Sequence, residues 1–242
     1  MNAEQIAALR VRGVLIEKSK GHFVIRLGLV GGSCTPELLR GAAELAERFG
    51  NGSIHLTTRQ SIEIQNVPEE FIHDALVHMD TLGLPSANSG ERVRTIVACP
   101  GHPVCCFSTG DTQSLAQSIH SHFSNCEGLN TKVKISITGC PNSCAKPQEN
   151  DIGIMTVGPK GYRLFIGGRI GRKPSLAIPL DLYAVNEDAV IRFVARTLDW
   201  LAKQGKPKER FASVIERVGQ ELFHSDVTQP WARDYGATLE KA

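Results

Sequence analysis

Four cysteines form two closely spaced pairs in this chain: Cys99 with Cys105, and Cys140 with Cys144. A short run that contains Arg or Lys precedes each pair, at residues 91–94 and 131–134. Four thiolates held close together are a soft, electron-rich ligand set, and such a set suits an iron–sulfur cluster or zinc. Positive charge beside a redox-active metal indicates that an anion reacts there. The residue types therefore predict redox chemistry on a small oxyanion.

The spacing of the two pairs favours a cubane [4Fe–4S] cluster over a structural zinc ion. Zinc ligands usually come in pairs separated by two to four residues, which fits the second pair but not the first. Loops rich in Pro and Gly are able to wrap a compact cluster, and both pairs lie in such loops. Zinc stays open as the alternative at this point. The spacing alone also leaves open whether Cys105 or the adjacent Cys106 is the ligand.

The composition is that of a soluble enzyme with nearly balanced charge. The 242 residues include 27 Lys and Arg against 25 Asp and Glu, so neither a nucleic acid nor a membrane surface is indicated as a partner. No hydrophobic run approaches the length of a membrane span, and the first residues lack the features of a signal peptide. We therefore expect a cytoplasmic protein. In that reducing compartment clustered cysteines bind metal more often than they form disulfides.

The first part of the chain, residues 1–88, predicts a small α+β unit. Apolar residues recur at strand spacing in 23–30 and then at helical spacing up to Gly50, with Thr35 as the expected N-cap. Two strands and a second helix follow, at 54–57, 62–67 and 68–83. This order of elements indicates a sheet with its helices on one face.

The second part, residues 89–223, repeats the alternation with the cysteine loops inserted. A short strand leads into the first cysteine loop, Asp111 is the expected N-cap of a helix, and an alternating strand ends at the second cysteine loop. A hairpin and two amphipathic helices follow, at 152–157, 162–166, 187–201 and 209–222. The remaining segment, 224–242, is mostly polar, and we interpret it as a C-terminal arm that docks elsewhere. The overall fold class expected is α+β.

Four segments of the chain together resemble the sirohaem-dependent sulfite and nitrite reductases. Two of them, 94–100 and 132–144, carry the cysteine pairs with their preceding cations. A third, 56–60, resembles the Thr-x-Arg-Gln segment of that family's ferredoxin-like half domain, and 161–169 resembles the strand and glycine turn that follow the cluster. The likeness covers about residues 20–220. It implies a ferredoxin-like half domain followed by an α+β domain that binds sirohaem and a [4Fe–4S] cluster.

The resemblance also implies how the cofactors are held. In this family a cubane cluster is bridged to the sirohaem iron by one cysteine thiolate. By position that bridge is Cys144, and the other irons bind Cys99, Cys105 and Cys140. The family's spacing favours Cys105 over Cys106.

The resemblance further implies a set of substrate-binding cations. Four basic residues surround the substrate on the open face of the haem in this family, and they fall here on Arg59, Arg94, Lys132 and Lys134. The weaker candidates, for packing near the macrocycle or pairing with its carboxylates, are Gln60, Asn142, Arg169 and Arg172. Taken alone, the two lysines also fit the solvated face of an ordinary strand. The presence of all four cations favours a site.

The activity implied is the six-electron reduction of sulfite to sulfide, with reduction of nitrite to ammonia as the alternative. A second alternative is a non-catalytic subunit that binds a tetrapyrrole or a cluster and transfers electrons. No Gly-x-Gly-x-x-Gly segment opens a helix after a strand, so a pyridine-nucleotide or flavin unit is not indicated. We expect an external electron donor such as ferredoxin or a reductase subunit.

The separation of the cations from the cysteines along the chain bears on whether one copy of the chain forms a complete site. Larger members of the family carry two copies of the half-domain and cluster-domain pair, whereas this chain has one. Lys134 precedes Cys140 by six residues, or about 20 Å of extended chain. The cluster lies on one face of the haem, and the cations must reach the other. We therefore expect a homodimer whose sites are shared between subunits. The compact low-molecular-weight sulfite reductases leave a monomeric site open as the alternative.

Overall fold

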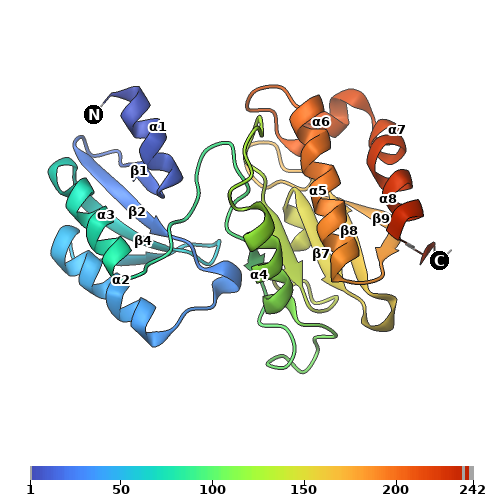
Figure 1. The fold of residues 1–242 in the computed structure, drawn as a ribbon, viewed down its shortest axis with the longest axis horizontal. Coiled ribbons are helices and arrows are strands. Elements are labelled where there is room, and N and C mark those ends of the chain that lie inside the picture. The colour runs from blue at the N-terminus through green and yellow to red at the C-terminus, as the bar shows by residue number, and fades with distance from the viewer. Residues whose placement is uncertain (1, 236–237, 240–242) are drawn as a thin grey trace. The chain divides into compact units, whose positions relative to one another are not determined.

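The computed structural model describes residues 2–235 and 238–239. The chain divides into two compact units, residues 1–90 and 91–242, which follow each other from blue to red in Figure 1. Both units combine helices with a sheet, which confirms the α+β class expected from the sequence. The division falls two residues after the predicted boundary at residue 88.

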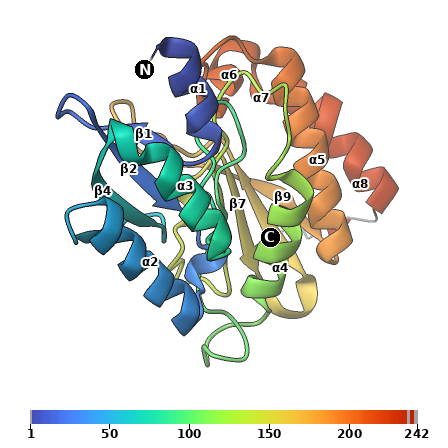
Figure 2. The same ribbon diagram turned by 60° about the vertical axis from the view of Figure 1, so that its left-hand side comes forward.

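The first unit is a four-stranded antiparallel sheet with the strand order β1-β2-β4-β3. Its main elements are α1 Ala3–Val11, β1 Val14–Ile16, β2 His22–Leu27, α2 Pro36–Phe49, β3 Ile54–Leu56, β4 Ile62–Pro68 and α3 Ile72–Thr81. Helices α2 and α3 lie on one face of the sheet (Figures 1 and 2). Their apolar sides pack against the buried side chains of β2 and β4, including Ile25, Leu27 and Ile64.

Local sequence signals set most of these boundaries. The Thr35 hydroxyl accepts the Leu38 N–H at 3.2 Å, which caps α2 at the predicted position, and Gly50 is its C-cap. The sequence did not indicate α1 and β1. Helix α1 carries no clear apolar stripe, and it begins at a capping box between Asn2 and Gln5. A two-residue reciprocal cap is a weak signal beside the long apolar periodicity of α2.

The second unit contains a six-stranded sheet with the order β10-β9-β8-β7-β6-β5. Strands β5 to β7 are parallel, and β7 to β10 are antiparallel. The elements are β5 Val97–Ala98, α4 Thr112–Phe123, β6 Ile135–Thr138, β7 Ile152–Thr156, β8 Tyr162–Ile166, β9 Ile178–Ala184, α5 Glu187–Gln204, α6 Phe211–Val218, α7 Gln220–Phe223, α8 Gln229–Tyr235 and β10 Thr238–Leu239. Helices α4 and α5 lie in front of the sheet in Figure 1.

Strand β6 differs from its sequence pattern. The alternation of apolar and polar residues fits a half-solvated strand, yet all four residues of β6 are buried, including Ser136 and Thr138 at 0% exposure. The reason is that β6 contacts α4 and the turn at Pro147–Glu149 as well as its neighbouring strands, and strands of a parallel set are covered on both faces. Strand β9, which the sequence did not indicate, joins the sheet beside β8.

The C-terminal segment is not the polar arm that the sequence indicated. Residues 224–228 form a π-helical turn, and α8 continues to Tyr235. Trp231 is fully buried, its indole N–H donates to the Ala189 carbonyl at 2.8 Å, and its ring contacts Phe193 edge-on. Phe223, Val227 and Trp231 recur every four residues, so one apolar stripe docks this segment on α5. Residues 236–237 and 240–242 of the predicted arm lie outside the described residues.

Within residues 2–235 and 238–239, none of the helices combines the length and apolar composition that crossing a bilayer needs.

Candidate functional site

The two cysteine loops leave the sheet of the second unit at the same edge. Strands β5 and β6 are parallel neighbours, with Ala98 beside Ile137. Cys99 follows β5 directly, and Cys140 follows β6 after Gly139. Both thiols are buried, at 8% and 7% exposure. Cys105 is half-buried, whereas Cys106 and Cys144 are exposed. The sheet thus places both pairs on adjoining loops, although 40 residues separate Cys99 from Gly139 in the chain.

The peptide of Gly139 joins the two loops. Its N–H donates to the Cys99 Sγ at 3.1 Å, and its carbonyl accepts the Thr156 hydroxyl at 2.7 Å and the Thr109 N–H at 2.9 Å. A Cβ at position 139 would lie 2.0 Å from the Ser108 hydroxyl, so only glycine fits. The Cys99 carbonyl is held in turn by the Thr112 hydroxyl at 2.6 Å. The loops are therefore fixed by side-chain contacts to backbone groups.

These loops carry the donor atoms that a thiolate-bound cluster needs, and they lie side by side. Their side chains do not converge on a common point. In the part of the chain that the structure describes, no three Cys, His, Asp or Glu side chains meet at a spacing that would hold a metal ion. Four thiols on two adjacent Pro- and Gly-containing loops are nevertheless the donor set that iron–sulfur clusters use. The backbone N–H donated to Cys99 Sγ is also a contact that a thiolate ligand accepts.

Three of the four predicted cations lie together on the second unit. Val93 and Val133 form a parallel bridge and are fully buried, and the Arg94 N–H donates to the Val133 carbonyl at 2.8 Å. Because side chains alternate along an extended chain, Arg94 and Lys134 occupy neighbouring positions on the opposite face from the valines. Lys132 shares that face two residues earlier. All three cations are half-buried.

The cations and the thiols lie at opposite ends of the same two strands. Arg94 precedes β5 and Cys99 follows it, and Lys134 precedes β6 and Cys140 follows it. The six-residue step from Lys134 to Cys140 spans about 20 Å in extended conformation. This separation is the observation on which the expected sharing of sites between subunits depends.

The fourth predicted cation, Arg59, lies in the first unit. It follows β3 in the tight turn that leads into β4, and its side chain is half-buried. The Thr57 hydroxyl accepts the N–H groups of Arg59 and Ser61 at 3.3 and 3.1 Å, which fixes the turn. Gln60 has a positive φ of 57°, and its side chain packs against Gly32. A residue held in that conformation by a turn is a common feature of binding sites.

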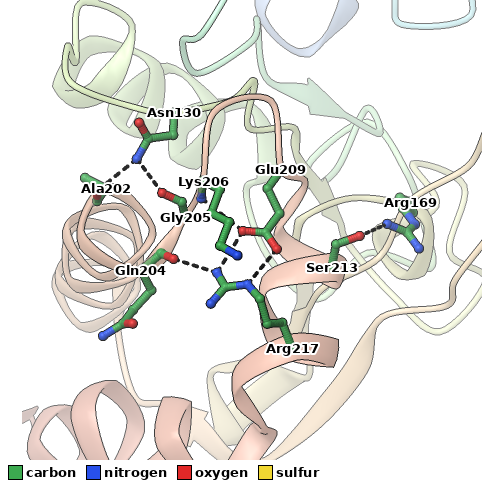
Figure 3. Close-up of polar contacts among 9 residues, drawn as sticks. All are labelled: Asn130, Arg169, Ala202, Gln204, Gly205, Lys206, Glu209, Ser213 and Arg217. Atoms are coloured by element: carbon green, nitrogen blue, oxygen red, sulfur yellow. Dashed lines mark hydrogen bonds and ion pairs between the residues drawn. The ribbon is translucent and has the colours of Figure 1, made fainter.

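The weaker candidates have different surroundings. The Arg169 guanidinium donates to the Ser213 hydroxyl (Figure 3). It also donates to the Lys173 carbonyl at 2.7 Å and to Glu216 at 3.2 Å. These contacts anchor the loop after β8 to α6. Arg172 in the same loop and Asn142 between the two cysteines of the second pair are exposed. Pairing of Arg169 with a cofactor carboxylate stays a prediction, as does the role of Arg172.

Sequence reasoning missed Asp151, which lies beside Lys134 just before the next strand. Asp151 precedes β7, is 0% exposed and accepts the Lys134 N–H at 2.8 Å. Arg210, which precedes α6, donates to both of its oxygens, at 2.7 and 3.3 Å. Burial raises the pKa of the Asp151 carboxyl, and the charge and hydrogen bonds of Arg210 oppose that rise. A lone aspartate after a Gly- and Pro-containing loop gave no signal in the sequence.

Comparison with known proteins agrees with these observations. Residues 89–235 match the family described as nitrite and sulphite reductase 4Fe-4S domain, and residues 16–76 match the nitrite/sulfite reductase ferredoxin-like half domain. The chain belongs to the nitrite and sulfite reductase family. The expected ferredoxin-like half domain followed by a cluster domain is confirmed by these matches.

Curated relatives of the family include both kinds of reductase. The chain is 27% identical to the coenzyme F420-dependent sulfite reductase of Methanocaldococcus jannaschii, over 90% of this chain and 44% of that protein. It is 28% identical to the ferredoxin sulfite reductase of Mycobacterium tuberculosis, over 79% of this chain and 37% of that protein. The NAD(P)H nitrite reductase of Bacillus subtilis is also 28% identical, over 88% of this chain and 26% of that protein. The chain spans less than half the length of these relatives.

Solved structures share the fold. The NirA protein of Mycobacterium tuberculosis superposes with a TM-score of 0.83 over 97% of this chain and 47% of that chain, at 18% identity. A dissimilatory sulfite reductase I superposes with a TM-score of 0.77 over 86% of this chain and 69% of that chain, at 14% identity. At these identities the likeness establishes the fold.

Proposed function

We propose that this protein reduces sulfite to sulfide at a sirohaem coupled to a [4Fe–4S] cluster. The observation that carries the proposal is the pairing of two thiol-bearing loops at one edge of the β5–β6 pair with a row of cations at the other, in a member of this family. Cys99, Cys105, Cys140 and Cys144 would hold the cluster, and Cys144 would also be the thiol that couples it to the sirohaem. Bound there, the coupled pair would supply electrons one at a time to the substrate.

The residues of this chain then have distinct tasks. Arg94 and Arg59 present planar forks that match two oxygens of an oxyanion, and Lys132 and Lys134 carry compact, proton-bearing charges. Together they would raise the local concentration of sulfite and hold it in place. They would also deliver the protons with which sulfite oxygens leave as water. Electrons would come from an external donor such as ferredoxin or a reductase subunit.

Nitrite reduction to ammonia at the same site is the second candidate, because curated relatives of both kinds match this chain. A comparison of kcat/KM for sulfite and for nitrite, with a chemical reductant as donor, separates the two. We expect a higher value for sulfite. A higher value for nitrite would overturn the sulfite assignment and keep the rest of the proposal.

Absorption spectroscopy of anaerobically purified protein tests the cofactors. We expect the bands of a reduced tetrapyrrole, and we expect them to shift when sulfite is added after dithionite. A brown spectrum without such bands would leave a bare cluster and favour an electron-transfer subunit, and a colourless protein would favour zinc. Cofactor bands without any turnover of sulfite or nitrite would support a non-catalytic binding protein.

We also propose that two copies of the chain share their sites in a homodimer, located in the cytoplasm. The support is the opposite placement of Lys134 and Cys140 on β6. Each haem would take its thiols from one subunit and its cations from the other.

Subunit mixing tests this arrangement directly. Alone, the Cys140→Ser protein is expected to be inactive, and the Lys134→Gln protein is expected to keep only about a hundredth of the wild-type kcat/KM for sulfite. Refolding or co-expressing them together gives mixed dimers in which one site receives both defects and the other receives none. With random pairing we expect about a quarter of the wild-type activity. Continued inactivity of the mixture, with mixed dimers shown by mass spectrometry, would place each site within one subunit.

A further inference from the structure

Asp151 is the one Asp, Glu, Lys or Arg residue that is fully buried among residues 2–235. Burial of a carboxylate costs free energy unless hydrogen-bond donors surround it. The presence of Asp151 at this place therefore calls for an explanation. The three groups that contact it all donate: the Lys134 N–H, and the Nε and Nη2 groups of Arg210. This set suits the ionised carboxylate, because a protonated carboxyl brings a donor of its own.

The sheet register places Asp151 directly beside Lys134. Ile135 pairs with Ile152 in the parallel β6–β7 ladder, so the preceding residues are also neighbours and their side chains share a face. Lys134 in turn lies beside Arg94 on the other side, through the Val93–Val133 bridge. A row of three charged residues therefore runs across the N-terminal ends of β5, β6 and β7, with the carboxylate at its end.

The backbone on both sides of this row is fixed. The Lys134 carbonyl accepts the Ile152 N–H at 3.1 Å, and the Asp151 carbonyl accepts the Gly167 N–H at 2.8 Å. Both oxygens of Asp151 accept hydrogen bonds, from the Arg210 guanidinium and from the Lys134 peptide N–H. The lysine backbone is thus held from its own N–H as well as from its carbonyl.

Arg210 connects this row to α6. It is the residue before Phe211, and its side chain is 18% exposed. The segment around it is held by Glu209, which accepts two hydrogen bonds from Arg217 at 2.8 Å, and by Asn130, which donates to the Gly205 carbonyl (Figure 3). The guanidinium therefore approaches Asp151 from a fixed segment.

We infer that Asp151 is a positioning residue for Lys134, which holds the lysine backbone in register with Arg94 and places a fixed negative charge beside the cation row. This inference rests on the proposed function, in which Lys134 binds the oxyanion. Asp151 itself does not contact the substrate. Without it, Lys134 would keep its charge but lose the anchor that sets where that charge lies.

A double-mutant cycle separates positioning from general stability. We expect Asp151→Asn to lower kcat/KM for sulfite about tenfold and Lys134→Gln to lower it about a hundredfold. The double variant should be no worse than Lys134→Gln, because a positioning residue has no effect once the group it positions is gone. If the double variant instead shows the product of the two single losses in kcat/KM, the inference is overturned. A purely structural role of Asp151 would act independently of Lys134 and give that product.

Two controls accompany the cycle. Asp181→Asn changes an exposed aspartate on β9 and should leave kcat/KM unchanged. Arg210→Lys keeps the positive charge but not the fork, and should produce a smaller loss that also vanishes in the Lys134→Gln background. If Asp151→Asn does not fold, the Arg210→Lys cycle decides, and multiplicative losses there would overturn the inference.

The two proposals fail in different ways. Absence of both cofactor bands and sulfite turnover in the wild-type protein would overturn the proposed function. Wild-type turnover by Lys134→Gln, with cofactor bands intact, would keep that function but remove Lys134 from the site, and the positioning inference with it. A large loss in Lys134→Gln beside wild-type kcat/KM in Asp151→Asn would keep the function and overturn the positioning role. The dissociation constant for sulfite, measured by calorimetry on the same four proteins, gives a readout without turnover and should show the same coupling.

Discussion

The two ends of the β5–β6 pair hold their functional side chains in different ways. At the thiol end, Cys99 and Cys140 lie on loops whose backbone is held by hydroxyl groups such as those of Thr112 and Thr156. At the cation end, Arg94 and Lys134 lie on extended chain that pairs with its neighbours through main-chain hydrogen bonds. The loop geometry depends on individual side chains, whereas the cation row depends on the ladder and on Asp151.

This difference shows which substitutions should affect catalysis without changing cofactor content. A change of Lys134 or Arg94 removes a charge and leaves the ladder that carries it, so the effect should fall on chemistry alone. A change in the cysteine loops removes either a ligand or a contact that shapes the loop, so cofactor content should change. The following predictions test this contrast, beginning with the largest expected effect.

Cys140→Ser should abolish cofactor binding, because a hydroxyl does not replace a buried thiolate as a soft ligand. We expect iron content and visible absorption to fall to background, with loss of all turnover. Cys126→Ser, which changes a cysteine outside the loops, is the matched control and should keep both. Full iron content in Cys140→Ser would place the cluster ligands elsewhere. The pair Cys105→Ser and Cys106→Ser sharpens the assignment, and we expect loss of iron from the first alone.

Lys134→Gln should lower kcat/KM for sulfite about a hundredfold while iron content and the absorption spectrum stay as in the wild type. The reason is that the lysine lies on the ladder, away from the loops that hold the cofactor. Arg192→Gln, which removes an exposed cation from α5, should leave kcat/KM unchanged. A loss of iron in Lys134→Gln would break the contrast between the two ends.

Thr112→Val should destabilise the thiol end by about 1–2 kcal/mol, because the buried Cys99 carbonyl loses one donor. Urea unfolding of the apoprotein measures this change. Ser114→Ala, an exposed position on the same helix, is the control and should change stability by no more than about 0.5 kcal/mol. Equal stability of the two variants would show that the Thr112 contact does not shape the loop.

The smallest effect concerns acid stability of the segment that carries Arg210. The pKa of Glu209 is lowered from 4.5 to about 2, chiefly by the Arg217 hydrogen bonds and further by the Lys206 N–H and the positive charges of both residues. Because the folded-state pKa lies below the unfolded-state value, the stabilising contribution is present above pH 4.5 and is lost as the pH falls toward 2. Glu209 is near the surface, so we expect no more than about 1 kcal/mol.

Urea unfolding at pH 5, 4 and 3 detects this contribution as a fall in the free energy of unfolding. Arg217→Gln should make that fall shallower, since the largest cause of the lowered pKa of Glu209 is then removed. An unchanged pH dependence in Arg217→Gln would show that the Arg217 contact does not set the pKa of Glu209.

Much of the fold followed from local signals. The caps at Thr35 and Asp111 and the stop at Gly50 stand where the sequence predicted them. These signals are reliable because each involves hydrogen bonds within three or four residues, which form whatever the rest of the chain does. The sequence of 224–235 indicated a mostly polar segment that docks, and the structure adds that an apolar stripe around Trp231 is what packs it on α5.

By itself the sequence determined the ligand types, their spacing and the order of elements around them. Only the tertiary structure decided that thiols and cations lie at opposite ends of β5 and β6, that β6 is buried throughout, and that Asp151 joins Lys134 to Arg210. The contacts of Asp151 cross 17 residues to Lys134 and 59 to Arg210. Pairings over such distances arise from how strands assemble in a sheet, and no local pattern in the chain specifies them.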